Sequence, residues 1–159
     1  MGMLKLKLET GDVTIETFED KAPKHVAQIT RLAEEGFYDG LTFHRVIDGF
    51  MAQGGCPNGT GMGGADEHIP AEFNDVSHQE GVCSMARAQD PNSAGSQFFV
   101  VHGDAGFLDG QYTVFGKLVD GFEALDAIAG GECKPGGEGS TPVDPIKVEK
   151  AVVLEGETA

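Results

Sequence analysis

The stretch TFHRVIDGFMAQ at residues 42–53 contains two short apolar runs of the kind that form strands. It predicts strands at Thr42 to Val46 and Phe50 to Gln53. Outward from it, similar runs predict further strands at Val82 to Arg87, Gln97 to Val101, Thr113 to Leu118 and Ile146 to Leu154. Nearer the N-terminus, leucines alternate with charged residues from Leu4 to Leu8 and the alternation resumes from Val13 to Thr17, which predicts a β-hairpin.

Two segments have the apolar spacing of helices instead. The first, Ala22 to Glu35, has Pro23 in its first turn and a glycine after its end. The second begins near Asp120 and stops before a Gly-Gly pair at 130–131. Eight strands and two helices predict a mainly β fold, a closed eight-stranded antiparallel β-barrel capped by two α-helices. Side chains fill the interior of such a barrel, so we expect any functional site on its outside.

Composition and charge limit the partners of the chain. Its 159 residues, 40% of them hydrophobic, suffice for one core, so we expect residues 1–159 to form a single domain. Lys and Arg number 11 against 26 Asp and Glu, a formal net charge of −15 that repels phosphate backbones and anionic membrane surfaces. We therefore expect neither nucleic acid nor membrane as a partner. The excess of acidic residues suggests a salt-rich host cytoplasm, where self-repulsion is screened.

The cysteines and the N-terminus indicate where the protein works. Cys56, Cys83 and Cys133 match neither C-x-x-C nor a disulfide framework, which favours a reducing cytosol. Residues 1–10 lack the continuous apolar segment of a signal peptide, and no stretch approaches about 18 apolar residues. We expect a soluble, cytoplasmic protein.

Other motifs are weak. Residues 59–64, GTGMGG, fit G-x-G-x-x-G, but the ADEHIP that follows neither opens a helix nor favours phosphate. The five histidines lack metal-ligand spacing, so each is expected to be an ordinary surface or core histidine. No serine lies in G-x-S-x-G, which argues against a serine hydrolase. We expect no cofactor and no metal.

Arg45 is the most informative side chain, because the chain has three arginines and this one lies in an apolar run. On the pattern alone it is an edge-strand cation paired with Asp48, since strands alternate outward charge with inward apolar residues. Its neighbours favour a binding role, because Phe50 and Met51 supply an apolar wall and Gln53 an amide donor.

Four motifs, in this order along the chain, carry a resemblance to a known family. They are FHRVIDGFMAQGG at 43–55, SMARA at 84–88, GSQFF at 95–99, and FLDG at 107–110 with VFG at 114–116. These motifs resemble the cyclophilin family of peptidyl-prolyl cis-trans isomerases over roughly Leu4 to Leu154. The family has an eight-stranded barrel with two helices, in agreement with the elements counted above. The likeness is closest to prokaryotic members, and the acidic composition suits haloarchaeal ones.

The resemblance implies a set of site residues. It implies that Arg45 is catalytic and that the substrate-binding residues are Phe50, Met51, Gln53, Ala86, Arg87, Ala88, Gln97, Phe99, Phe107, Leu108 and Tyr112. Among them, Phe50, Met51, Phe99 and Leu108 would line a proline pocket. The two glutamines would orient Arg45 or the substrate backbone, and residues 86–88 would offer an extended edge to the peptide. We expect Val82, Phe98 and Phe115 to be core.

The chain departs from many eukaryotic members at three of these positions. Phe107 stands in place of Trp and Tyr112 in place of His, so the resemblance implies only weak cyclosporin binding. Arg87 stands where some members have Asn, which would change the preference for residues that flank proline.

The expected activity is rotation about X-Pro bonds in unfolded or flexible segments by a monomer, which assists slow folding steps. Two alternatives remain open at this point. One is a proline-peptide binding module or holdase without turnover, and the other is a nucleotide-binding enzyme built on Gly59 to Gly64.

Overall fold

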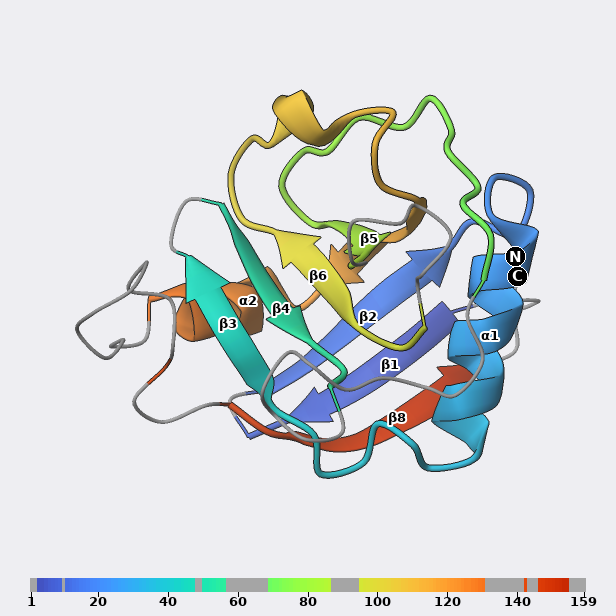
Figure 1. The fold of residues 1–159 in the computed structure, drawn as a ribbon. Coiled ribbons are helices and arrows are strands. Elements are labelled where there is room, and N and C mark those ends of the chain that lie inside the picture. Colours follow the sequence, from blue (N-terminus) through green and yellow to red (C-terminus); the bar gives the residue numbers. More distant parts are fainter. Residues whose placement is uncertain are drawn as a thin grey trace.

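The computed structural model describes residues 3–9, 11–47, 50–56, 69–86, 95–130, 142 and 146–154 (Figure 1). Its elements are β1 (Met3–Leu8), β2 (Gly11–Thr17), α1 (Pro23–Glu34), β3 (Phe43–Ile47), β4 (Met51–Gly54), β5 (Val82–Met85), β6 (Phe98–Val101), the 3-10 turn η1 (Gly106–Leu108), β7 (Val114–Asp120), α2 (Phe122–Ala129) and β8 (Val148–Leu154). These elements confirm the predicted strands and helices. No helix in the described part of the chain is both long and apolar enough to cross a membrane.

The eight strands form one antiparallel sheet in the order β3-β4-β6-β5-β7-β2-β1-β8. The sheet curls into a half-barrel, with α1 and α2 at opposite sides of it (Figure 1). The predicted closure of the barrel is wrong, because the end strands β3 and β8 meet in one isolated bridge, Thr42 with Lys147, rather than in a ladder. Closure depends on pairing between the first and last strands of the sheet, which alternation within each strand does not encode.

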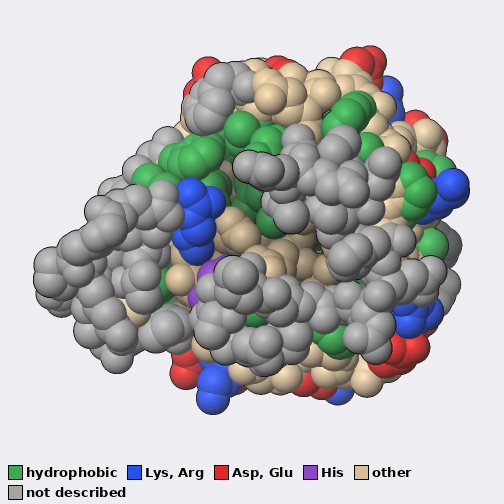
Figure 2. All heavy atoms as spheres, in the orientation of Figure 1, with side chains coloured by type: hydrophobic (Ala, Val, Ile, Leu, Met, Phe, Trp, Pro, Cys, Tyr) green, Lys and Arg blue, Asp and Glu red, His purple; other side chains and the backbone are tan. Residues whose placement is uncertain are grey.

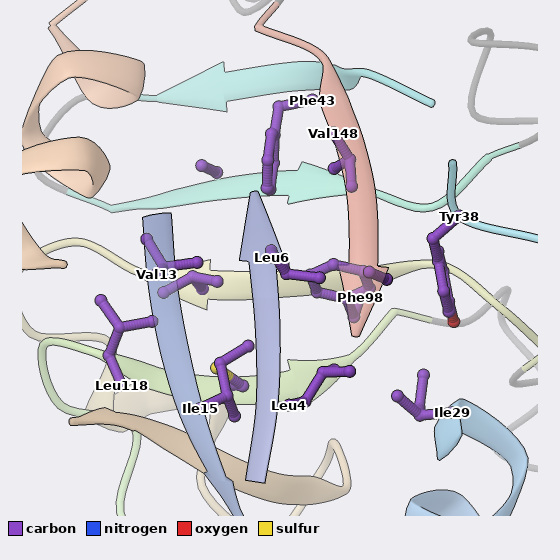
Figure 3. Packing of buried hydrophobic residues seen from close by; sticks show 14 of the residues in the cluster. Leu4, Leu6, Val13, Ile15, Ile29, Tyr38, Phe43, Phe98, Leu118 and Val148 are labelled. Carbon is purple, nitrogen blue, oxygen red and sulfur yellow. The ribbon is translucent and has the colours of Figure 1, made fainter. Parts of the chain in front are cut away.

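The concave face of the sheet holds the main core (Figure 3). Alternate residues of β1 and β2, including Leu6 and Ile15, point into it and are at most 4% exposed. Phe98 meets both Phe43 and Phe115 edge-on, each with ring centroids 6.2 Å apart. Burial of each such side chain stabilises the fold by about 1.5–3 kcal/mol. Phe98 and Phe115 are therefore confirmed as core residues.

Helix α1 packs its apolar face, which includes Val26, Ile29 and Leu32, against this core. Pro23 suits the first helical turn, but Ala22 offers no side chain that could cap it. The cap comes instead from the distant Glu72, whose carboxylate accepts hydrogen bonds from the backbone N–H groups of Lys24 at 3.1 Å and His25 at 2.8 Å. The helix is thereby fastened to the segment that precedes β5.

Candidate active site

A β-bulge in β3 decides which way Arg45 points. Phe43 pairs with Gly54 and Arg45 with Gln53, so that His44 is the extra residue between them. The extra residue lets Phe43 and Val46 both enter the main core, although they are three positions apart. Arg45 is thereby turned to the convex face, the same face as Gln53.

A row of polar side chains runs across this face from β3 through β4 to the residue that precedes β6. Arg45 Nη1 donates a hydrogen bond to Gln53 Oε1 at 3.2 Å. Gln53 Nε2 in turn donates to Gln97 Oε1, immediately before β6, at 2.9 Å. All three side chains are half-buried. At this contact the acceptor of the guanidinium is a neutral amide oxygen. The alternative partner, Asp48, lies outside the described residues.

The chain after β4 packs closely against the residues that precede β6. Ser96 Oγ donates a hydrogen bond to Gly55 O at 2.7 Å. Gly55 has φ +92°, and a Cβ at this position would lie 2.5 Å from Ser96 O. Glycine is thus required for the chain after β4 to approach residues 96 and 97.

A second apolar cluster adjoins the polar row on the convex face, and we call it the outer cluster. Its buried members are Met51, Val82, Phe99, Val101, Ala105 and Val114, and its partly buried members are Phe18, Ile47, Phe50, Val76, Ala86, Leu108 and Tyr112. Phe99 lies directly across from Gln53 in the β4–β6 ladder. Figure 2 shows a hollow on this side of the molecule, with hydrophobic side chains and a basic side chain at its border.

The structure brings together most of the residues that the resemblance implied. The outer cluster contains Phe50, Met51, Ala86, Phe99, Leu108 and Tyr112, and the polar row beside it contains Arg45, Gln53 and Gln97. Arg87 and Ala88 lie outside the described residues, as does the GTGMGG motif. Phe107 belongs to η1, but its side chain is not described.

Sequence reasoning placed one residue on the wrong side of the sheet and missed others. Val82 is a member of the outer cluster and not of the main core. Val101, Ala105 and Val114 were given no role. Strand parity could have placed Val82 correctly, because it lies four residues before Ala86, and could have found Val101, which lies two residues after Phe99.

His44 lies beside Arg45 and is kept neutral by its surroundings. Both of its ring nitrogens are buried, and among the described residues neither has a hydrogen-bond partner. Burial lowers the pKa of His44, and the positive charge of Arg45 lowers it further. A second cation beside Arg45 is therefore disfavoured.

One group in the described part of the chain has a donor set that could hold a metal ion. Glu80, His102 and Asp126 each offer one ligand atom within 4.8 Å of the others. Two of the three are exposed, and His102 Nε2 already hydrogen-bonds Asp126 Oδ1 at 3.1 Å. They come from three separate segments, so that no local spacing marks them in the sequence.

Comparison with known proteins gives consistent matches. The family model for the cyclophilin type peptidyl-prolyl cis-trans isomerases matches residues 3–153. The chain is 46% identical to a "Probable peptidyl-prolyl cis-trans isomerase" of Brucella abortus, over 93% of this chain and 80% of the relative. It is 48% identical to peptidyl-prolyl cis-trans isomerase B of Bacillus subtilis, over 79% of this chain and 89% of the relative.

A similar solved structure is that of a Cryptosporidium parvum cyclophilin type isomerase, crystallised in the presence of the dipeptide Ala-Pro. It superposes with a TM-score of 0.88 at 34% identity, over 98% of this chain and 99% of the other.

Proposed function

The chain belongs to the cyclophilin-type peptidyl-prolyl cis-trans isomerases, and from that premise we propose that Arg45 is its catalytic residue. The reaction is rotation about the peptide bond that precedes a proline. The observation that carries the proposal is the position of Arg45, which donates to Gln53 directly beside Phe99 and the outer cluster. A proline ring on that cluster brings its amide nitrogen close to the guanidinium.

Arginine suits the chemistry of this rotation. The barrier of about 18–20 kcal/mol arises because C–N resonance is lost as the bond twists. In the planar amide the nitrogen lone pair is delocalised, whereas in the twisted amide it is localised and accepts a hydrogen bond. A fixed N–H donor therefore interacts mainly with the transition state, which is the kind of interaction that raises turnover. Arginine stays charged at any working pH and presents several donors in one plane.

The size of this contribution shows that Arg45 does not act alone. A hydrogen bond to a charged group contributes about 1.5–3 kcal/mol, and each factor of ten in rate requires about 1.4 kcal/mol. Arg45 accordingly supplies roughly a ten- to hundredfold acceleration. The remainder comes from the pocket.

We assign the grip on the proline ring to Phe50, Met51, Phe99 and Leu108. The planar amide is the more charge-separated form, so a surface with little water disfavours it relative to the twisted form. Gln53 and Gln97 orient Arg45 or the substrate backbone, and the segment Ala86, Arg87 and Ala88 offers an edge along which the peptide extends. Phe107 and Tyr112 complete the pocket, and we expect them to permit weak cyclosporin binding.

The substrates we propose are proline-containing peptides and flexible or unfolded segments of proteins, in which slow X-Pro isomerisation delays folding. The Ala-Pro dipeptide named for the Cryptosporidium parvum structure supports this substrate class. The chain acts as a single-domain monomer in the cytoplasm, without cofactor, nucleic acid or membrane partner.

The net charge of −15 supports a salt-rich host, as in haloarchaea. A higher Tm in about 2 M KCl than in dilute buffer is the expected result, since salt screens repulsion among the carboxylates. Equal stability and activity in both buffers would contradict the proposal.

The catalytic assignment is tested with Arg45→Ala and Arg45→Lys. Catalysed exchange between the cis and trans signals of a short proline peptide is measured by NMR, which needs no coupled protease. We expect Arg45→Ala to lose about tenfold or more of kcat, and Arg45→Lys to lose nearly as much, because lysine keeps the charge without the planar fork. Undiminished exchange in folded Arg45→Ala refutes the assignment. Peptide binding by the wild type without catalysed exchange would instead indicate a binding module.

A further inference from the structure

A histidine at the back of the outer cluster makes contacts that the mechanism above does not use. The side chain of His78 is 0% exposed, yet both ring nitrogens have partners. Nδ1 lies 2.9 Å from Asp109 Oδ1 and, because a carboxylate only accepts, it is the nitrogen that donates. Nε2 lies 2.9 Å from Ser84 Oγ. The ring therefore connects the turn after η1 with β5.

This arrangement contains the residue types of a hydrolase triad, but it is not built as one. Ser84 is 0% exposed, which leaves a substrate no access to its hydroxyl. The single proton of that hydroxyl is engaged elsewhere, because Ser84 Oγ donates a hydrogen bond to Thr113 O at 3.0 Å. A nucleophile has to face its substrate, and Ser84 faces the interior of the protein.

The ring of His78 packs against Phe99, which lines the proposed proline pocket. The two rings are stacked, with centroids 6.0 Å apart and planes inclined by 18°. Tyr112 meets the same Phe99 edge-on, with centroids 5.7 Å apart and planes at 84°. Phe99 is thus held by two rings, and one of them is itself fixed by hydrogen bonds at both nitrogens.

Asp109 is next in the chain to Leu108, which lines the proposed pocket. Its carboxylate accepts hydrogen bonds from the backbone N–H of His78 at 2.7 Å and from Ser77 Oγ at 2.7 Å, in addition to the ring. Hydrogen bonds from Ser77 and from the backbone and ring of His78 lower the pKa of Asp109 to about 2, so that it is ionised at working pH. The backbone N–H of Ala105, at the start of the same turn, donates to His78 O at 2.9 Å.

We propose that His78 and Asp109 are positioning residues, which together fix Phe99 and Leu108 at the spacing that a proline ring requires. The inference rests on the proposed function, because it takes these two side chains as walls of the pocket. Phe99 comes from a β-strand and Leu108 from a 3-10 turn, so that no single element sets the distance between them. The hydrogen bond between His78 Nδ1 and the Asp109 carboxylate supplies that link. Small misplacements of groups that hold a substrate weaken its productive binding.

Four variants test the inference. Asp109→Ala removes the carboxylate, and His78→Phe keeps the stacking ring but removes its hydrogen bonds. Asp109→Asn is the conservative replacement, since its amide oxygen can still accept from His78 while its NH₂ faces Ser77 Oγ. Ser77→Ala is the matched control, because it removes a donor to the same carboxylate without touching either ring. Free energies of unfolding in urea show which variants remain folded.

We expect Asp109→Ala and His78→Phe to raise the KM for a proline peptide about tenfold while kcat stays within about threefold, because the row from Arg45 to Gln97 is untouched. Asp109→Asn should recover most of the loss, and Ser77→Ala should resemble the wild type. The proton on His78 Nδ1 should give a slowly exchanging, low-field NMR signal that disappears in Asp109→Ala and His78→Phe.

Arg45→Ala, measured in parallel, separates this inference from the proposed function. A drop in kcat for Arg45→Ala, together with an unchanged KM in folded Asp109→Ala and His78→Phe, overturns the positioning role alone. An Asp109→Asn variant as impaired as Asp109→Ala also overturns it. Undiminished kcat in Arg45→Ala overturns the catalytic assignment, whatever the other variants do.

Discussion

Arg45 and Gln53 face each other across the β3–β4 ladder, and the side-chain oxygen Oε1 of Gln53 accepts a hydrogen bond from the guanidinium at 3.2 Å. The amide of Gln53 is at the same time engaged with Gln97, which fixes its oxygen toward Arg45. Gln53 thus helps to hold the guanidinium of Arg45 in a fixed orientation.

We predict that Gln53→Ala lowers kcat/KM by about five- to thirtyfold, because Arg45 loses a hydrogen bond that orients it and contributes roughly 1–2 kcal/mol. The measurement is NMR exchange on a proline peptide. Gln79→Ala, at an exposed position, serves as the control and should match the wild type. A Gln53→Ala enzyme that is as active as the control would show that Arg45 needs no such support.

We predict a rate that does not change with pH from about 6.5 to 9. Arg45 does not titrate in this range, and the lowered pKa of His44 keeps that ring neutral throughout it. The measurement is kcat/KM for an uncharged proline peptide across the range. A bell-shaped profile centred near neutrality would instead implicate His44 in proton transfer.

We predict that Gly55→Ala destabilises the fold more than Gly40→Ala. Both glycines have positive φ, +92° and +84°, so that each replacement incurs the same backbone strain of about 1 kcal/mol. At Gly40 a Cβ meets nothing within 4 Å, whereas at Gly55 it lies 2.5 Å from Ser96 O. Urea denaturation of both variants gives the difference. Gly55→Ala should also lower isomerase activity, because a shift of Ser96 displaces its neighbour Gln97. Equal destabilisation of the two glycine variants, together with full activity of Gly55→Ala, would contradict this account.

We predict that the contact between Glu72 and His25 makes the fold sensitive to acid. Burial tends to raise the pKa of Glu72, but hydrogen bonds from His25 and Lys24 outweigh it and hold the pKa below its usual value. Its stabilising effect is therefore complete above the unfolded pKa, near 4.5, and is lost as the pH falls through the lower folded value. Burial also lowers the pKa of His25 in the folded protein. As the pH falls below about 6.5, His25 therefore binds a proton in the unfolded chain before it does in the folded one, which favours unfolding.

Glu72→Ala should therefore cost about 1–2 kcal/mol of unfolding free energy at neutral pH, as for the loss of a helix cap, and should flatten the part of the decline that lies below about pH 4.5. Glu19→Ala, which removes an exposed carboxylate, should change neither. A decline in acid that persists unchanged in Glu72→Ala would assign it to other groups.

The sequence predicted the elements well because each has its own local signal. Leu4, Leu6 and Leu8 alternate strictly, and Pro23 and Gly36 mark the two ends of α1. Alternation fails where a strand changes parity. An alternating pattern does not predict the bulge at His44. It therefore does not predict that Phe43 and Val46 share one face of the sheet while Arg45 lies on the other.

The candidate site was predicted through motif resemblance and not through physics. An alternating pattern alone could have made Arg45 an ordinary edge cation, and Val82 was assigned to the wrong face. Long-range relationships were also beyond reach. The contacts of His78 with Asp109 and Phe99 join residues that are 31 and 21 positions apart, and the sequence gives no sign that they meet. The missing ladder between β3 and β8, within the residues that the structure describes, could not be predicted either, because it too depends on segments far apart in the sequence.

The bulged strand β3 is also a terminal strand of the open sheet, with ladder pairing to β4 alone. As a terminal strand it is expected to exchange its amides with solvent more readily than the central strands β5 and β6. We therefore expect the strand that carries the guanidinium to open before the central strands, so that mild heating or denaturant lowers activity ahead of global unfolding.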